Sequence, residues 1–162
     1  MRITITGPRE VPEAAERWQV LFEWYVGPFA HSGHDFFVGG GAGIDTLALQ
    51  WLVAHRAPVT VVVPATVEDQ PDEARERIRE TERAVLAEVV ELRHPEFPDA
   101  AAYQARDRYM VDRSSLVIGY APPDGDTEAG WSALDYAASK GMPRLVVPAG
   151  ASAATGRNAP SR

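Results

Sequence analysis

The fold is decided by a turn between a predicted strand and a predicted helix, in the segment Phe36-Phe37-Val38-Gly39-Gly40-Gly41-Ala42-Gly43-Ile44-Asp45. The β-rich run at its start breaks into glycines, and an amphipathic helix opens directly after them. Glycines let backbone N–H groups approach an anion closely, and a helix N-terminus adds unsatisfied donors and a positive dipole end. The segment therefore predicts an anion-binding turn. The alternative is that the glycines serve only the tight packing of the helix on the sheet.

Strand and helix patterns alternate along the rest of the chain. This alternation predicts an α/β fold with a single Rossmann-like, doubly wound, mainly parallel sheet flanked by helices. The predicted strands are residues 2–6, 36–38, 58–63, 88–92, 116–121 and 144–147, and the predicted helices are residues 15–25, 43–56, 72–86, 100–113 and 127–140. We expect one domain over residues 1–148. Residues 149–162 are small and polar, so we expect a disordered tail there.

The composition limits the class of protein. The chain has 162 residues, a net charge of −7, no cysteine, and four histidines without metal-ligand spacing, so we expect neither a metal site nor a cofactor. No apolar run approaches the roughly 20 residues that span a bilayer, and no signal-peptide pattern is present. We therefore expect a cytoplasmic protein that does not engage a membrane. The acidic charge does not favour nucleic acid as a partner, because that affinity comes largely from Lys and Arg.

The residues suited to ligand binding follow the predicted strands. In an open parallel sheet, ligands bind outside the carboxyl ends of the strands, so the loops that leave the strands matter. Four such loops are residues 6–9, the glycine turn, residues 64–66 and residues 123–128. Together they predict a nucleotide-sized anion pocket. Its ligand-binding residues are Gly7, Pro8, Arg9, Gly39, Gly40, Gly41, Ala42, Gly43, Asp45, Pro64, Gly125 and Thr127. On the helix over residues 100–113, Arg106 and Arg113 share a face with Met110, which is typical of an exposed face beside a core contact.

These segments resemble, in chain order, the signature blocks of the SLOG superfamily. The matching stretches are Thr6-Gly7-Pro8-Arg9, residues 38–45, residues 106–111, residues 116–120 and Gly125-Asp126-Thr127. SLOG is a Rossmann-like group that includes the DNA-processing protein DprA, the LOG phosphoribohydrolases and small YspA-like proteins. The resemblance spans residues 2–148 and implies that a nucleotide or nucleotide derivative is bound by the first loop, the glycine turn and the Gly-x-Thr loop.

The LOG branch of this superfamily implies a catalytic arginine, which matches Arg106. It also implies a glutamate that assists cleavage of the N-glycosidic bond of a nucleoside monophosphate. This chain departs from the pattern, because that glutamate position is Gly130 and because Asp107 and Asp126 replace other expected residues. Hydrolysis of an N-glycoside needs a carboxylate near the developing positive charge. In an enzyme, Glu128 or Asp126 would supply this carboxylate beside Arg106.

Three functions remain open at this point. The first is a sensor or carrier that binds a nucleotide without turning it over, which fits the missing glutamate. The second is a LOG-like phosphoribohydrolase. The third is single-stranded DNA binding of the DprA type, against which the acidic single domain counts. We also expect a homodimer through helix faces, because so small a core cannot bury all four tryptophans, Trp18, Trp24, Trp51 and Trp131.

Overall fold

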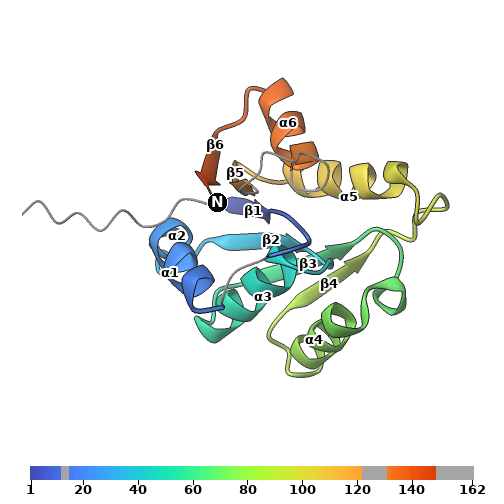
Figure 1. The fold of residues 1–162 in the computed structure, drawn as a ribbon, viewed down its shortest axis with the longest axis horizontal. Helices are drawn as coiled ribbons and strands as arrows, with labels where there is room; N and C mark the ends of the chain where they lie inside the picture. The colour runs from blue at the N-terminus through green and yellow to red at the C-terminus, as the bar shows by residue number, and fades with distance from the viewer. Residues whose placement is uncertain (12–14, 122–130, 149–162) are drawn as a thin grey trace, which may run out of the picture.

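The computed structural model describes residues 1–11, 15–121 and 131–148 as one six-stranded sheet with helices on both faces (Figure 1). All strand pairings are parallel and the strand order is β4-β3-β2-β1-β5-β6. The strands are β1 (Arg2–Thr6), β2 (Asp35–Gly39), β3 (Val59–Val63), β4 (Glu88–Glu91), β5 (Leu116–Ala121) and β6 (Arg144–Pro148). The predicted α/β, Rossmann-like fold is confirmed. The predicted tail over residues 149–162 lies outside the described residues.

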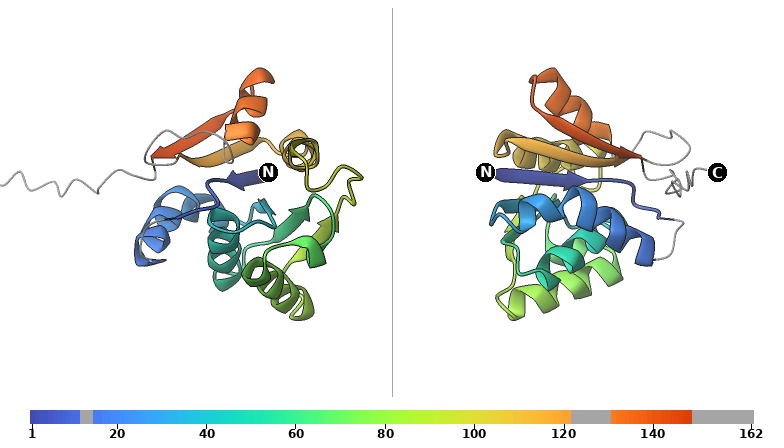
Figure 2. Two further views of the ribbon diagram at one scale, coloured as in Figure 1. Left: turned by 45° about the vertical axis from the view of Figure 1, so that its right-hand side comes forward. Right: turned by 90° about the vertical axis from the view of Figure 1, so that its left-hand side faces the viewer.

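The helices form two layers. Helices α1, α3 and α4 cover one face of the sheet, and α5 and α6 cover the other (Figure 2). The helices are α1 (Ala15–Tyr25), α2 (Gly27–Ala30), α3 (Ile44–Ala54), α4 (Asp72–Arg83), α5 (Ala100–Asp112) and α6 (Trp131–Ser139), with a short 3₁₀ turn η1 (Val67–Asp69). None of the described helices is long and apolar enough to cross a membrane.

Helix α2 and the short turn η1 are the elements that the sequence patterns missed. Gly27-Pro28 ends α1 as expected, but the same pair opens a further short helix. Proline is tolerated in the first turn of a helix, where its missing N–H is not needed. The N–H groups of Phe29 and Ala30 both donate to the carbonyl of Val26 (3.0 Å each), so the chain turns without leaving the α1 layer.

The strand order reverses at β1, and this positions the site. β1 pairs with β2 on one side and with β5 on the other. Consecutive connections therefore leave in opposite directions at this point, which is where open α/β sheets bind ligands. In register, Thr6 at the end of β1 pairs with Gly119 of β5. The loop that begins at Gly7 thus lies beside the end of β5.

The core explains where the tryptophans lie. Trp18 and Trp51 are only 2% and 4% exposed, and they pack with Phe22 and Tyr120 between the sheet and the helices. Trp24 is 60% exposed. The side chain of Trp131 lies outside the described residues. Because Trp24 is largely exposed, the core does not bury all four tryptophans, as expected, and a homodimer through helix faces stays a prediction.

Candidate functional site

The glycine turn between β2 and α3 is packed around the side chain of Asp45. The Gly41 N–H donates to Asp45 Oδ2 (3.1 Å), and the Thr46 hydroxyl donates to the Gly41 carbonyl (2.9 Å). A Cβ atom on Gly39 would overlap Asp45 Oδ2 and would lie 2.8 Å from Arg106 Nη1. Glycine at position 39 is therefore required by a side-chain pair that fills the space beside it.

Gly43 joins the turn to the loop that follows β1. Its φ of 72° lies in the left-handed region, and a Cβ atom there would overlap the carbonyl oxygens of Pro8 and Arg9. The Ile44 N–H donates to the Pro8 carbonyl (3.1 Å), so the first loop and the glycine turn form one unit. These contacts agree with the alternative interpretation of the glycines, in which they serve the close packing of the helix on the sheet. The assignment of the turn to ligand binding stays a prediction.

Arg106 is held between two carboxylates in the interior. Its Nε and Nη2 atoms donate to Asp107 Oδ1 (3.1 and 2.9 Å), and its Nη1 atom lies 3.6 Å from Asp45 Oδ2. The side chain of Arg106 is 7% exposed, and those of Asp45 and Asp107 are 12% and 4% exposed. The expected exposed arginine–methionine face is wrong, because Arg106 and Met110 are both buried. A buried charge persists only when it is paired and hydrogen-bonded, which this arrangement provides.

Burial sets the protonation of this ion cluster. Burial raises the pKa of Asp45, although Arg106 and the Gly41 N–H each oppose the shift. Burial alone would lower the pKa of Arg106, but Asp107 and then Asp45 raise it above its ordinary value. Arg106 therefore stays charged. Its guanidinium group faces carboxylates on two sides, an arrangement that fits a positioning role better than contact with a substrate.

The exposed chemistry of this edge lies just outside the ion cluster. The guanidinium carbon of Arg9 lies 4.3 Å from the centroid of the Tyr103 ring, and that of Arg106 lies 5.7 Å from it. Phe97 packs against Tyr103 with ring centroids 5.8 Å apart. Arg9 is exposed and the two rings are half-buried. We call these three residues, Arg9, Phe97 and Tyr103, the edge cluster.

The sequence analysis named Arg9 but missed Phe97 and Tyr103. Tyr103 lies in the first turn of α5, and Phe97 lies in the loop between β4 and α5. Because α5 runs back across the sheet, its first turn lies at the carboxyl ends of the strands. The signal that could have identified these rings is their position after β4, combined with the rule that loops leaving parallel strands share one edge.

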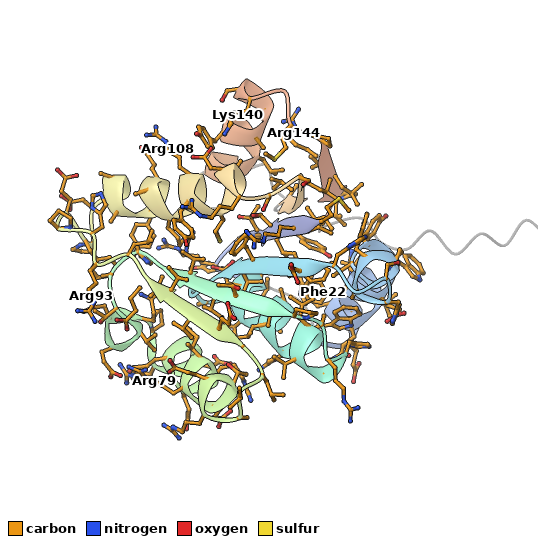
Figure 3. The ribbon with its side chains drawn as sticks, turned by 180° about the vertical axis from the view of Figure 1, so that it is seen from behind. Phe22, Arg79, Arg93, Arg108, Lys140 and Arg144 are labelled. Carbon is orange, nitrogen blue, oxygen red and sulfur yellow. The ribbon has the colours of Figure 1, made fainter. Side chains whose placement is uncertain are left out.

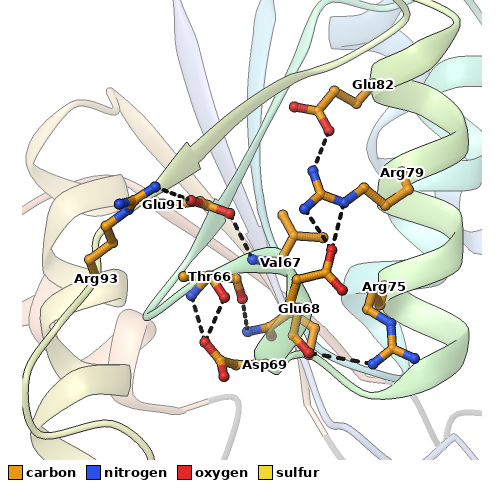
Figure 4. A network of polar contacts seen from close by, with 10 residues as sticks. Thr66, Val67, Glu68, Asp69, Arg75, Arg79, Glu82, Glu91 and Arg93 are labelled. Atoms are coloured by element: carbon orange, nitrogen blue, oxygen red, sulfur yellow. Dashed lines mark hydrogen bonds and ion pairs between the residues drawn. The ribbon is translucent and has the colours of Figure 1, made fainter.

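A hydrogen-bonded rim lies at the carboxyl ends of β3 and β4 (Figure 4). Asp69 Oδ2 accepts bonds from the N–H and the hydroxyl of Thr66 (3.1 and 2.7 Å), and these bonds lower the pKa of Asp69. Glu91 Oε1 accepts from the Val67 N–H (3.0 Å), which lowers the pKa of Glu91. Pro64, a predicted ligand residue, is buried beneath this rim, where its carbonyl accepts from the N–H of His94 (2.9 Å).

Other predicted features fall elsewhere. Gly125, Asp126, Thr127, Glu128 and Gly130 lie outside the described residues. Within the described ranges, no three His, Asp or Glu side chains are grouped to hold a metal ion. A cavity of about 530 Å³ lies at the opposite edge of the sheet, at the strand starts, and is lined in part by Arg2, Phe37, Val90 and Tyr109. The predicted ligand residues do not line it, and the cluster of arginine and aromatic side chains is at the carboxyl edge.

Comparison with known proteins supports the fold. No protein-family model matches the chain, and no curated protein is similar to it in sequence. Among solved structures, DNA processing protein A from Helicobacter pylori, described as having a unique single-stranded DNA binding mode, superposes with a TM-score of 0.68 and 19% identity over 91% of this chain. DprA from Streptococcus pneumoniae superposes with a TM-score of 0.67 and 16% identity over 96% of this chain.

These similarities show a DprA-like, Rossmann-like fold. The chain spans 65% and 52% of the lengths of the two matched chains. SLOG membership is not confirmed by a family model and stays a prediction. The expectation that nucleic acid is not a partner is wrong as argued, because a protein with this fold is described as binding single-stranded DNA. Net charge alone is therefore no ground for excluding nucleic acid.

Proposed function

We propose that this protein binds single-stranded nucleic acid at the carboxyl edge of its sheet, through the edge cluster of Arg9, Phe97 and Tyr103. The observation that carries the proposal is the stack of Arg9 on Tyr103, with 4.3 Å between the guanidinium carbon and the ring centroid. This stack lies beside the end of β1, where the strand order reverses.

Each member of the edge cluster has a role that suits an unpaired strand. A base of any type can stack on an aromatic ring. Each stacked base contributes about 1–3 kcal/mol to the free energy of binding in proteins that bind single strands. Arg9 is exposed, so its guanidinium group is free to contact a phosphate while its face rests on Tyr103. Bases in a duplex are already stacked on one another, and the edge cluster therefore favours single strands.

The glycine turn and the start of α3 hold the backbone of Arg9 in place. The Pro8 carbonyl accepts the Ile44 N–H, and Gly43 packs against the backbone of Pro8 and Arg9. Arg106, fixed by Asp45 and Asp107, lies against the inner side of Tyr103. The buried ion cluster thus orders the exposed edge cluster, and less conformational entropy is lost when a strand binds.

The nucleotide-binding hypothesis is the second candidate. It is favoured by the reversal of strand order between β1 and β5, a position at which open α/β sheets bind ligands and which would place a single nucleotide beside Gly7 and Arg9. The LOG-like hydrolase hypothesis depends on Asp126 or Glu128, which lie outside the described residues. Arg106 is directed at Asp45 and Asp107, which does not favour its use as a catalytic group.

The test of the proposal is a fluorescence-anisotropy titration with a labelled oligothymidylate of about 15 nucleotides, within the range of known single-strand site sizes. The matched comparison is the same sequence in a duplex, and both titrations are repeated at raised salt. We expect single-strand binding that weakens with salt and exceeds duplex binding. Competition by a nucleoside monophosphate at comparable concentration would favour the second candidate. Absence of oligonucleotide binding at low salt would contradict the proposal.

A further inference from the structure

The arginines of α4 and α5 differ in their partners. On α4, Arg75 is paired with Asp72 (2.7 Å), Arg77 with Glu80 (2.8 Å), and Arg79 with Glu82 (2.9 Å). These charges are neutralised along the helix itself, which is the usual arrangement on a solvated face. This face of α4 therefore offers little to a charged partner.

The exposed arginines on α5 and at its C-cap lie on aromatic rings instead. Arg108 lies 5.6 Å from the centroid of the Tyr136 ring of α6, and Arg113 lies 3.7 Å from that of Tyr109. Within the described parts of the chain, neither arginine has a carboxylate in ion-pair distance. A guanidinium group on a ring face keeps its edge N–H groups available to an anion.

Tyr136 is the centre of this surface. Its ring lies between Arg108 and Lys140, whose Nζ atom is 5.4 Å from the ring centroid. The Tyr136 hydroxyl donates to Asp112 Oδ1 (2.9 Å), and Lys140 bonds to the same carboxylate atom. Lys140 is the main cause that holds the pKa of Asp112 below its ordinary value, so this carboxylate stays ionised. The ring and its neighbours are thus fixed in place before any partner arrives.

The exposed charges here are mainly basic, although the chain as a whole is acidic. The basic side chains are Arg108, Arg113, Lys140 and Arg144, and the exposed acidic ones of α5 and α6 are Asp112 and Asp135. Figure 3 shows Arg108, Lys140 and Arg144 projecting in a row on the same side of the molecule. The row begins over α5, which starts at the carboxyl edge, and ends at Arg144, which opens β6 at the opposite edge.

We propose that this α5–α6 surface is a second contact for a polyanion, and that it binds the phosphate backbone of the same single strand beyond the edge cluster. The inference rests on the proposed function. Arg108 and Arg113, which lie on rings and have no carboxylate within ion-pair distance among the described residues, contact phosphates. Lys140 and Asp112, in contrast, hold Tyr136 in place beneath Arg108. Because Tyr103 lies in the first turn of α5 and Arg113 caps its C-terminus, one strand of sufficient length reaches both surfaces along this helix.

The experiment compares a short strand, a thymidine dinucleotide that cannot extend from Tyr103 to Arg113, with a longer oligothymidylate of about 15 nucleotides, within the range of known single-strand sites. The test variant is Arg108→Ala/Arg113→Ala, and the control variant is Arg77→Ala/Arg83→Ala on α4. We expect the test variant to weaken binding of the longer strand about tenfold and to reduce its salt slope by about 1.4, the value for two lost phosphate contacts. Binding of the short strand should not change, and the control variant should match the wild type.

A rescue variant separates charge from folding. Arg108→Lys/Arg113→Lys keeps both positive charges and should restore the wild-type salt slope, with affinity for the longer strand between those of the wild type and the alanine variant because the ring stacking is lost. Equal loss for both strand lengths, or no loss for either, would overturn the inference. If the wild type binds both strands and the Arg108→Ala/Arg113→Ala variant binds them with the same affinities, the α5–α6 surface does not contact the strand, and the proposed function stands. If the wild type binds neither strand, the proposed function itself fails.

Discussion

The Nη1 atom of Arg106 lies 3.6 Å from the Oδ2 atom of Asp45, beneath the glycine turn that joins β2 to α3. Asp107 holds the other side of the same guanidinium group. This pair links two elements that are distant in the chain, because Asp45 opens α3 and Arg106 lies on α5. It also explains why position 39 carries glycine. The exposed edge cluster above it rests on this buried arrangement.

Arg106→Ala should destabilise the fold strongly. The substitution leaves Asp45 and Asp107 buried without their cation, and a broken buried ion pair costs about 3–5 kcal/mol. Urea unfolding measures the change in the free energy of unfolding. Arg77→Ala, which removes one arginine of an exposed pair on α4, is the control and should cost less than about 1 kcal/mol. Similar losses of unfolding free energy in the two variants would contradict the claim that the buried ion cluster of Arg106 contributes more than an exposed ion pair.

Gly39→Ala should destabilise through overlap with the same ion pair. The new methyl group would meet Asp45 Oδ2 and Arg106 Nη1, and overpacking of this kind costs about 1–3 kcal/mol. In an Asp45→Ala background the space is vacated, so the added methyl group should cost less. A double-mutant cycle by urea unfolding measures this coupling. Strictly additive effects would contradict the packing role of Gly39.

Glu91 should make part of the stability dependent on pH. The Val67 N–H lowers the pKa of Glu91 below its ordinary value of 4.5, so the ionised form is favoured in the folded state. Its contribution is therefore present above about pH 4.5 and is lost as the pH falls through the lower pKa of the folded state. The difference in unfolding free energy between wild type and Glu91→Gln should be largest near neutral pH and shrink in acid. A difference in unfolding free energy that grows in acid would contradict the lowered pKa of Glu91 in the folded state.

Tyr103→Ala should weaken single-strand binding more than it weakens the fold. Loss of one stacked base is worth about 1–3 kcal/mol, which is about 5- to 150-fold in Kd. Tyr103→Phe keeps the ring and should bind nearly as well as wild type. Tyr25→Ala, on the C-terminal turn of α1, is the control for removal of a half-buried tyrosine elsewhere. If Tyr103→Ala and Tyr25→Ala bind alike, the ring is not a stacking platform.

The fold followed from local patterns, whereas the site depends on contacts between distant residues. Apolar runs such as residues 59–63, where Val61, Val62 and Val63 are fully buried, identify strands covered on both faces. The glycine turn likewise marks the junction of β2 and α3. Helix α2 was missed because four residues are too few to show a helical period.

The proposed edge cluster overlaps the residues predicted from the sequence only at Arg9, and the reason is physical. Arg9 was named because it directly follows a strand. Tyr103 and Phe97 were missed because their role depends on α5 bringing its first turn to the end of β1, which no local pattern records. Arg106 was placed on an exposed face because the sequence does not reveal its pairing with Asp45. A charged side chain is buried only when an opposite charge lies beside it in the fold, and here that charge comes from a distant part of the chain.

The most direct test of the central claim is photo-crosslinking of the full chain to an oligonucleotide that carries bromodeoxyuridine, with the crosslinked peptides identified by mass spectrometry. Stacked aromatic rings are the groups closest to the bases in the proposed complex. We predict crosslinks at Tyr103 or Phe97, and their loss when unlabelled single strand competes. Crosslinks confined to peptides away from the carboxyl edge, such as those of α4, would contradict the account.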